Sequence, residues 1–505
     1  MENQVENPNL EQSNKPSQQI NSLISGRSLH IYNTLTRKKE EFKSIVQGKV
    51  NMYSCGPTVY SDAHIGNLRS YIFPDILKRV LSKIGYTITH IINITDVGHL
   101  TDDASDGADK MELSAQKKGE TVWDISRRYT ENFMDDLKSL NILAPTKFTK
   151  ATDYIDAQIE MVHGLEKKGY VYRIEDGIYF DTSKFKAYAD FAKIDIGNLR
   201  EGERVDFGEK RNKTDFALWK MSPKDGTKRQ MEWDSPWGVG FPGWHIECSA
   251  MIWKELGPQI DIHTGGTDHI PVHHTNEIAQ ATCFHGSTPV NYWLHGEFLV
   301  LDKNKRIGKS EGNSITLNTL VEKGFDPIAY RFLVLTAHYK SFLTFSEESL
   351  SQAQISLQRL KKDIKKIYNS TEELKIEENN ISLSQEAQNY VQLIMNGLLD
   401  DLNTPMALAA LREMLSDAEL TKNEKILITG FFDEIFGLEL LNFSSLEKQN
   451  KPIPIDILKK AEERWAYKMN KNFAKADELR IEIEKLGYSI SDYKDHYDIC
   501  PIDLI

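Results

Sequence analysis

At 505 residues the chain is too long for one hydrophobic core, and its length predicts three or four domains. Its 40% hydrophobic and 27% charged residues are typical of a soluble globular protein, and no apolar run is long enough to predict a membrane-spanning helix. The formal net charge of −12 argues against non-specific binding of polyanions, so contact with nucleic acid requires local basic patches.

The first 28 residues are rich in Asn, Gln, Ser and Glu and lack hydrophobic periodicity, so we predict a disordered tail over residues 1–28. The segment has no apolar core of a secretory signal, and its acidic residues argue against an organellar transit peptide. The four cysteines are too few for a disulfide framework and fit a reducing compartment. We therefore expect a cytoplasmic protein whose thiols are buried or bind a metal.

A strand, a turn, a helix and a second strand are predicted from residue 50 onward. Residues 50–55 form a short strand pattern that ends at Gly56-Pro57, and apolar residues at helical spacing predict a helix over residues 68–84. Residues 86–95 alternate and are rich in β-branched side chains, which predicts the second strand. A strand, helix, strand unit builds a parallel sheet, so we predict an α/β fold.

Later segments extend this architecture. Apolar strand patterns near residues 259–263 and 291–301 indicate that the sheet resumes after a mixed, charged insertion at about residues 102–211. After residue 345 the strand patterns end, and helical spacing continues to about residue 440. A polar break with prolines at residues 450–454 predicts the start of a last small domain.

The turn His64-Ile65-Gly66-Asn67, between the first strand and the helix, is the first motif with chemical potential. Gly66 lets the backbone approach a ligand, and the following helix directs N–H donors and a positive dipole end toward it. His64 and Asn67 add donors that could stabilise charge on a phosphate. Taken alone, these residues also fit the commoner case of a histidine packed at a turn.

A second set of residues has the chemistry of metal ligands. Cys55 ends the first strand, Cys248 follows much later, and His273 and Glu277 are four residues apart, so on a helix they share a face. Two thiolates, an imidazole and a carboxylate suit zinc, with His274 as the alternative ligand. Each residue alone also fits a structural role, and only the joint set indicates a metal site.

A third motif, residues 305–313, contains Gly308-Lys309-Ser310 as a P-loop does. A P-loop also needs a glycine five residues before Gly308, and position 303 is Lys, so that interpretation fails. Two interpretations remain. The segment is either a glycine-flanked loop that presents cations to a polyphosphate or a solvated surface turn.

These motifs are recognisable when taken together in chain order. They are Cys-Gly-Pro-Thr-Val-Tyr at 55–60, His-Ile-Gly-Asn at 64–67, Asn-Ile-Thr-Asp at 93–96, Gly-Trp-His-Ile-Glu-Cys-Ser-Ala-Met at 243–251, His-His-x-Asn-Glu-Ile-Ala-Gln at 273–280 and Gly-Lys-Ser-x-Gly-Asn at 308–313. Asp-Asp-Leu-Asn-Thr-Pro at 400–405 and Asn-Phe-Ala-Lys-Ala-Asp at 472–477 continue the series. The chain resembles the cysteinyl-tRNA synthetases, a family of class I aminoacyl-tRNA synthetases, from about residue 29 almost to its end.

The resemblance implies roles for the matched residues. The implied ATP-binding residues are His64, Gly66, Asn67, Asp268, Arg306 and Lys309, with His64, Asn67 and Lys309 as the catalytic ones. The implied zinc ligands are Cys55, Cys248, His273 and Glu277, and the implied amino-acid pocket includes Thr95 and Trp244. The sequence departs from the family's KMSKS loop, because Arg306 replaces its first Lys and Gly308 its first Ser.

The resemblance also implies an architecture and a reaction. We expect a Rossmann-like class I catalytic domain over residues 29–342, a helical tRNA-binding domain over residues 343–445 and a C-terminal anticodon-side domain over residues 451–505. The expected enzyme activates cysteine with ATP to cysteinyl-adenylate and transfers it to the 3′ end of tRNA(Cys). One zinc per chain would select the substrate thiolate, Mg²⁺ would accompany ATP, and the family suggests a monomer.

Three alternatives stay open at this point. A ligase with the same core could join cysteine to a small-molecule acceptor, although the C-terminal domains disfavour it. A zinc- and tRNA-binding paralogue without catalysis is suggested by the altered loop at residues 306–310. A synthetase for another amino acid is disfavoured by the Cys₂-His-Glu set.

Overall fold

The structure is a computed structural model that describes residues 16–98, 110–193, 209–222, 229–301, 305–306, 314–369, 382–447, 454–492 and 496–501. These residues form two compact units. The first unit contains Leu29–Ser82 and Tyr86–Leu350. The second combines Lys83–Gly85 with the described residues up to Ser28 and from Ser351 onward.

A five-stranded parallel sheet lies at the centre of the first unit, with the strand order β11-β10-β3-β4-β5. Its strands are β3 (Lys49–Ser54), β4 (Thr87–Ile94), β5 (Lys147–Lys150), β10 (Ile260–Gly266) and β11 (Val290–Gly296). The residues of β10 are buried along its whole length, as expected for an inner strand of a parallel sheet covered on both faces. The predicted α/β fold with a parallel sheet is confirmed.

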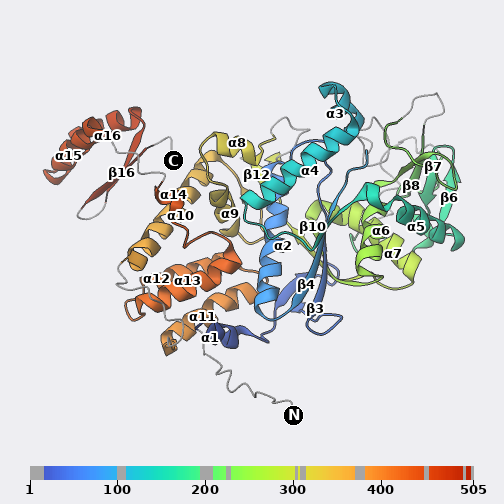
Figure 1. Cartoon of the computed structure of the whole chain (residues 1–505), viewed down its shortest axis with the longest axis horizontal. Coiled ribbons are helices and arrows are strands. Elements are labelled where there is room, and N and C mark those ends of the chain that lie inside the picture. The colour runs from blue at the N-terminus through green and yellow to red at the C-terminus, as the bar shows by residue number, and fades with distance from the viewer. Residues whose placement is uncertain are drawn as a thin grey trace, which may run out of the picture. The chain divides into compact units, whose positions relative to one another are not determined.

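Helices cover both faces of this sheet. Helix α2 (Ile65–Lys83) connects β3 to β4, and α7 (Thr275–His285) connects β10 to β11. The two connections move in opposite directions along the sheet, and parallel crossovers are right-handed, so the helices lie on opposite faces (Figure 1). Helix α6 (Trp244–Leu256) packs against α7 and against α5 (Ile155–Lys167).

The predicted bounds of the insertion are wrong. Residues 147–150, inside the predicted range, form β5 and pair with β4 in the central sheet. The separate sheet is antiparallel, has the order β6-β7-β8-β9 and extends to Pro242, well beyond residue 211. The sequence of β5, Lys-Phe-Thr-Lys, is a short edge strand with charged ends, so it lacks the apolar pattern of an inner strand. Besides β5 and α5, this region contains α3 (Lys110–Lys118), α4 (Val122–Ser139), β6 (Val171–Ile174), β7 (Gly177–Phe180), β8 (Phe216–Met221) and β9 (Gly240–Pro242).

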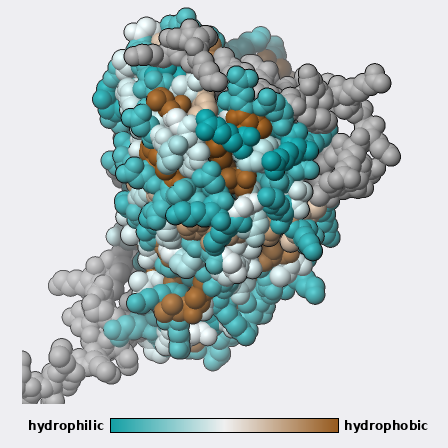
Figure 2. All heavy atoms as spheres, turned by 90° about the vertical axis from the view of Figure 1, so that its right-hand side faces the viewer, coloured by the Kyte–Doolittle hydropathy of each residue, from teal (hydrophilic) through white to brown (hydrophobic). Residues whose placement is uncertain are grey.

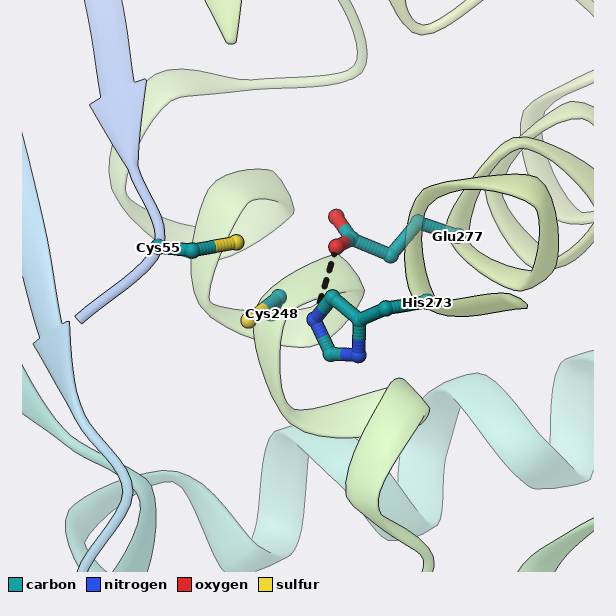
Figure 3. A group of neighbouring side chains, drawn as sticks. All are labelled: Cys55, Cys248, His273 and Glu277. Carbon is teal, nitrogen blue, oxygen red and sulfur yellow. Dashed lines mark ion pairs between the residues drawn. The ribbon is translucent and has the colours of Figure 1, made fainter. Parts of the chain in front are cut away.

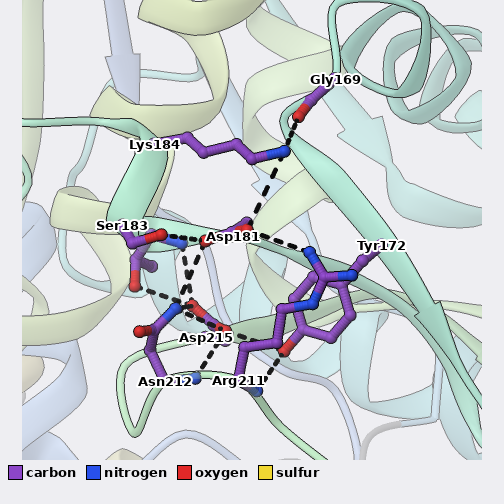
Figure 4. A network of polar contacts seen from close by, with 9 residues as sticks. Gly169, Tyr172, Asp181, Ser183, Lys184, Arg211, Asn212 and Asp215 are labelled. Carbon is purple, nitrogen blue, oxygen red and sulfur yellow. Dashed lines mark hydrogen bonds and ion pairs between the residues drawn. The ribbon is translucent and has the colours of Figure 1, made fainter.

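Buried carboxylates fix the segments that flank this antiparallel sheet (Figure 4). Asp215 accepts hydrogen bonds from the Tyr172 hydroxyl and from the backbone N–H of Thr182, and each of these bonds is 2.8 Å long. Asp181 accepts hydrogen bonds from Ser183 and forms an ion pair with Arg211 over 3.3 Å. Because buried charges are costly unless they are paired, this network specifies one arrangement of the segments around residues 181 and 212.

Short elements complete the first unit. Strands β1 and β2 form a hairpin, β12 pairs with both β13 and β14, and two helices lie between β13 and β14 in the chain. They are β1 (His30–Asn33), β2 (Lys38–Glu41), β12 (Leu299–Leu301), β13 (Lys305–Arg306), α8 (Leu317–Glu322), α9 (Pro327–Leu335) and β14 (Leu343–Thr344).

The second unit is mainly helical, and it corrects the predicted disordered tail. Residues 1–15 lie outside the described residues, but Pro16–Ile24 form helix α1, so the prediction is wrong from residue 16 onward. Ile20 and Ile24, one helical turn apart, are fully buried, and α1 contacts α11 and α13. The helices are α10 (Glu347–Asn369), α11 (Gln385–Leu399), α12 (Thr404–Ser416), α13 (Lys422–Phe436) and α14 (Ser444–Glu447).

The C-terminal residues have a small core of their own. Helices α15 (Ile455–Met469) and α16 (Phe473–Lys485) pack with the hairpin β15 (Tyr488–Asp492) and β16 (Tyr497–Pro501). The buried residues of this core are Ile457, Ala461, Ile483 and Ile490. Arg464 and Asp492 add an ion pair of 2.7 Å between α15 and β15.

Neither the described helices nor the face shown in Figure 2 has the features of a membrane-spanning segment. Within the described ranges, no helix is both long and apolar enough to cross a bilayer. Figure 2 shows hydrophilic residues over most of one face, with hydrophobic residues in small separate groups.

Candidate active site and metal centre

The candidate site lies where β3 and β10 end, side by side in the sheet. The backbone N–H of Cys55, the residue after β3, donates to the carbonyl oxygen of Thr264 in β10 over 3.1 Å. From this point one crossover leads toward β4 and the other toward β11, on opposite faces. Ligands of open α/β sheets bind at such a switch point, at the carboxyl ends of the strands.

Four predicted ligands converge here (Figure 3). Cys55 follows β3, Cys248 lies in α6, His273 lies in a π-helical turn (Ile270–His274), and Glu277 lies in the first turn of α7. All four are buried, and one ligand atom from each lies within 4.8 Å of every other. His273 Nε2 and Glu277 Oε1 are 3.0 Å apart, as the spacing of four residues predicted.

The donor set fits a metal ion. Tetrahedral zinc, at about 2.3 Å from sulfur and about 2.0–2.1 Å from nitrogen or oxygen, separates its donors by roughly 3.3–3.8 Å. The four ligand atoms of the cluster lie within 4.8 Å of one another, so small side-chain shifts reach those separations. A second group, formed by Cys55, His263, His274 and Glu277, meets the same criterion, and His274 Nε2 lies 3.2 Å from Cys55 Sγ. His274 therefore stays an alternative ligand.

The charges of the cluster favour a cation. Contact with the Cys55 sulfur lowers the pKa of Cys248 to about 6, whereas burial raises the pKa of Cys55 well above its ordinary value. Burial would raise the pKa of Glu277, but His263 and His273 hold it below its usual range. Burial would likewise lower the pKa of His273, but Glu277 and Cys248 raise it to about 10. At neutral pH Cys248 and Glu277 thus carry negative charge in a buried site, and the protonated ring of His273 balances part of it. A metal ion bound at His273 would take the place of that proton.

Further histidines, which sequence reasoning did not assign, orient the cluster. His263 Nε2 lies 2.9 Å from Glu277 Oε2, and His245 Nδ1 lies 3.0 Å from His273 Nδ1. His295 Nε2 lies 2.7 Å from His274 Nδ1. Contacts of this kind hold metal ligands in position. For His245 a sequence signal was available, because it precedes Cys248 by three residues in a helix. The positions of His263 and His295 in adjacent parallel strands are known only from the sheet order.

The predicted phosphate-binding turn caps helix α2. Asn67 N–H donates to His64 Nδ1 over 3.1 Å, and His64 N–H donates to Asn67 Oδ1 over 3.3 Å, a reciprocal arrangement like a capping box. Because Nδ1 accepts this bond, a neutral His64 ring carries its hydrogen on Nε2. The helix starts at Ile65, three residues before the predicted start. The prediction followed the spacing of apolar residues, whereas the observed start is set by this cap.

The remaining predicted residues lie around the two motifs. Trp244 is half-buried, and its ring centroid lies 4.7 Å from that of His273. Thr95 is buried after β4, where its N–H donates to the carbonyl oxygen of Pro57 over 3.0 Å. Asp268 is exposed in the turn that follows β10.

The predicted catalytic loop is described only at its two ends. Lys309 lies outside the described residues, and Arg306 pairs with Val300 through its backbone. On the other side of the loop, the carbonyl oxygen of Ile315 accepts a hydrogen bond from Ile65 N–H over 2.8 Å, and Thr316 bridges to His64. The residues that follow the loop are therefore anchored to the predicted phosphate-binding turn.

Solved structures define the class of this fold. Methionyl-tRNA synthetase of Mycobacterium tuberculosis in complex with methionyl-adenylate matches with a TM-score of 0.53 and 12% identity, over 81% of this chain and 99% of that one. Agrobacterium radiobacter K84 agnB2 LeuRS, in a ternary complex, matches with a TM-score of 0.56 and 11% identity, over 81% and 87%. These likenesses show a tRNA synthetase fold.

Sequence comparison identifies the family. The model for the class I (C) tRNA synthetase catalytic domain matches residues 41–355. Cysteine–tRNA ligase 1 of Burkholderia lata is 46% identical over 92% of this chain and 95% of its own length, and cysteine–tRNA ligase of Treponema denticola is 43% identical over 92% and 98%. The chain therefore belongs to the cysteine–tRNA ligase family of class I synthetases and is an ATP-dependent aminoacyl-tRNA ligase.

Proposed function

We propose that this enzyme charges tRNA(Cys) with cysteine in two steps. First, a carboxylate oxygen of cysteine bonds to the α-phosphorus of ATP while the bond to the β-phosphate oxygen breaks, and pyrophosphate leaves. Next, a hydroxyl of the terminal adenosine of the tRNA bonds to the activated carbonyl carbon, and AMP leaves. The observation that carries the proposal is the convergence of Cys55, Cys248, His273 and Glu277 beside Trp244 in a member of this family.

The metal centre is the proposed determinant of amino-acid choice. The donor set suits one zinc per chain, held by the four residues of Figure 3. When bound, zinc would supply a position for the substrate thiolate, which the hydroxyl of serine cannot imitate because its pKa is much higher. Trp244, packed on the ring of His273, and Thr95 would form the walls of the pocket that holds the cysteine.

The turn at the start of α2 is the proposed phosphate site. His64 Nε2–H, Gly66 N–H and the Asn67 side-chain amide would donate to ATP phosphates at the positive end of the helix dipole. Lys309 and Arg306 would add positive charge, with Mg²⁺ neutralising the polyphosphate. The anchoring of Ile315 to Ile65 supports this pairing, because it ties the end of the loop to the turn. The exposed carboxylate of Asp268 would accept hydrogen bonds from the ribose.

The later residues are proposed to bind tRNA. The helices between residues 343 and 445 would carry the body of the tRNA, and residues 451–505 would reach the anticodon. Support comes from the small core around Ile457 and Ile483, which gives the C-terminal residues a separate packing unit.

Two assays on the purified full-length chain test the proposal. Cysteine-dependent exchange between ATP and pyrophosphate reports the first step, and cysteine charging of tRNA(Cys) reports both. We expect both activities. Exchange without charging would identify a ligase for a small-molecule acceptor, and the absence of both activities would identify a non-catalytic paralogue.

A further inference from the structure

Tyr330 lies in helix α9, outside every motif that the sequence singled out, and reaches the phosphate-binding turn. Its side chain is completely buried, and its hydroxyl donates to the carbonyl oxygen of Ile65 over 2.6 Å. The N–H of Ile65 donates to the carbonyl oxygen of Ile315 over 2.8 Å. Both polar backbone groups of one residue in the turn are therefore held from outside helix α2.

These two bonds fix the orientation of two peptide planes. The N–H of Ile65 belongs to the peptide that carries the His64 carbonyl, and the Ile65 carbonyl belongs to the peptide that carries the Gly66 N–H. A trans peptide is planar, and its C=O and N–H point in opposite directions. When the Ile65 carbonyl points at the buried Tyr330 hydroxyl, the Gly66 N–H points the opposite way, out of the N-terminus of α2.

The hydroxyl also changes the strength of that donor. A carbonyl that accepts a hydrogen bond is polarised, and the N–H of the same peptide becomes a better donor. The first turn of a helix otherwise has the weakest restraint, because its initial N–H groups have no partners within the helix. Tyr330 supplies a restraint at this point.

Helix α9 is fixed at its N-terminus and against α2. The Asp326 side chain caps its N-terminus by accepting a hydrogen bond from Ile328 N–H over 2.8 Å, and Pro327 occupies its first position. The next residue after Tyr330, Arg331, is fully buried and forms an ion pair of 2.6 Å with Asp75 in α2. Two successive side chains of α9 thus bind α2.

We infer that Tyr330 is a positioning residue for adenylate formation, because its hydroxyl holds the Ile65–Gly66 peptide with its N–H directed at the phosphates of ATP. This inference rests on the proposed role of the turn formed by residues 64–67. Tyr330 itself is buried behind the turn and acts through the peptide.

The substitution Tyr330→Phe removes the hydroxyl and keeps the ring. Tyr292→Phe is the matched control. The Tyr292 hydroxyl also donates to a backbone carbonyl, that of Glu41, at a distance of 3.1 Å. Tyr292 lies near the end of the parallel strands that is opposite to the candidate site. For Tyr330→Phe we expect kcat of cysteine-dependent exchange to fall about tenfold, with KM for cysteine unchanged, since a misplaced donor weakens the transition state. Tyr292→Phe should leave kcat at the wild-type value.

A third variant separates this inference from the proposed function. If His64→Ala loses exchange while Tyr330→Phe retains the wild-type kcat, the positioning role is refuted and the phosphate-binding turn is upheld. If His64→Ala exchanges normally, the proposed role of the turn fails, and the inference fails with it. A loss of kcat in Tyr330→Phe that is matched by Tyr292→Phe, with equal falls in melting temperature, would also refute positioning.

Discussion

Cys248 and Cys283 provide a matched pair for testing the metal centre. Both are buried cysteines in helices, 2% and 6% exposed, but only Cys248 belongs to the ligand cluster. Burial raises the pKa of Cys283 to about 11, so it remains a neutral thiol. Cys248→Ala and Cys283→Ala therefore remove the same atoms from similarly packed sites.

The expected difference follows from the linkage between binding and folding. Each substitution loses about 1 kcal/mol of packing. If free zinc exceeds the Kd of the intact site about a thousandfold, binding adds about 4 kcal/mol to the free energy of unfolding. Loss of one of the four ligands removes most of this contribution. We therefore expect Cys248→Ala to lose about 5 kcal/mol and Cys283→Ala about 1 kcal/mol.

Metal analysis and denaturant unfolding, with and without a chelator, measure both quantities. We expect one zinc per chain in the wild type and in Cys283→Ala, and none in Cys248→Ala. The chelator should bring the two variants to the same stability. Retention of one zinc by Cys248→Ala, or a stability difference that survives the chelator, would refute the assignment of Cys248 as a ligand.

Four further outcomes are expected. Lys309→Ala should lower the kcat of cysteine-dependent exchange about 10²–10³-fold without changing cysteine binding, because a charge that stabilises the transition state is lost. An unchanged exchange rate would indicate that Arg306 carries this role instead. Deletion of residues 451–505 should preserve exchange and weaken tRNA charging, and equal loss of both would contradict the separate roles. Ile24→Ala should destabilise the helical unit by about 2–5 kcal/mol in denaturant unfolding, whereas the exposed Asn21→Ala should change it by less than about 0.5 kcal/mol. Arg464 and Lys468 hold the pKa of Asp492 below its ordinary value of 3.8, so their ion pairs stabilise the C-terminal unit at neutral pH. This contribution declines as the pH falls below about 4, because the unfolded chain then binds a proton at Asp492 more readily than the folded chain does. Asp492→Asn should therefore have a lower melting temperature than the wild type at pH 7, and this difference in melting temperature should become smaller at acidic pH. An equal difference at pH 7 and at acidic pH would rule out the ion pair as the cause.

The inner strands could be predicted because burial on both faces imposes an apolar pattern. Five consecutive residues of β4 are buried, and its β-branched sequence reads as a strand without further context. Strand β5 pairs on one side only and carries lysines at both ends, so its place in the sheet depends on tertiary contacts. Helix α1 was missed because its apolar residues, Ile20, Leu23 and Ile24, cover only about one helical turn of a polar segment, and the burial of Ile20 and Ile24 depends on α11 and α13.

The candidate ligands were predictable for a different reason. Cysteine, histidine and glutamate have specific metal chemistry, and their chain order resembles that of a known family, so Cys55 and Cys248 were paired across a long separation. Tyr330 acts through a hydroxyl and a backbone carbonyl, and neither group leaves a sequence pattern. The hydrogen bonds of His245 and His263 likewise depend on ring orientations that only the folded chain defines.

The strand order of the central sheet has a consequence for biosynthesis. Strand β3 lies between β4 and β10 in the sheet. Strand β4 is the next strand in the chain, whereas β10 is translated only after the whole antiparallel sheet. While the ribosome makes the intervening residues, one edge of β3 has no partner in the sheet, and Cys55 has no Cys248, His273 or Glu277 to join. Unpaired strand edges are sites of aggregation in partly folded chains. The nascent chain therefore carries the unpaired edge of β3 and the thiol of Cys55 without its partners until β10 and β11 emerge. During this interval we expect the chain to depend most on chaperone binding.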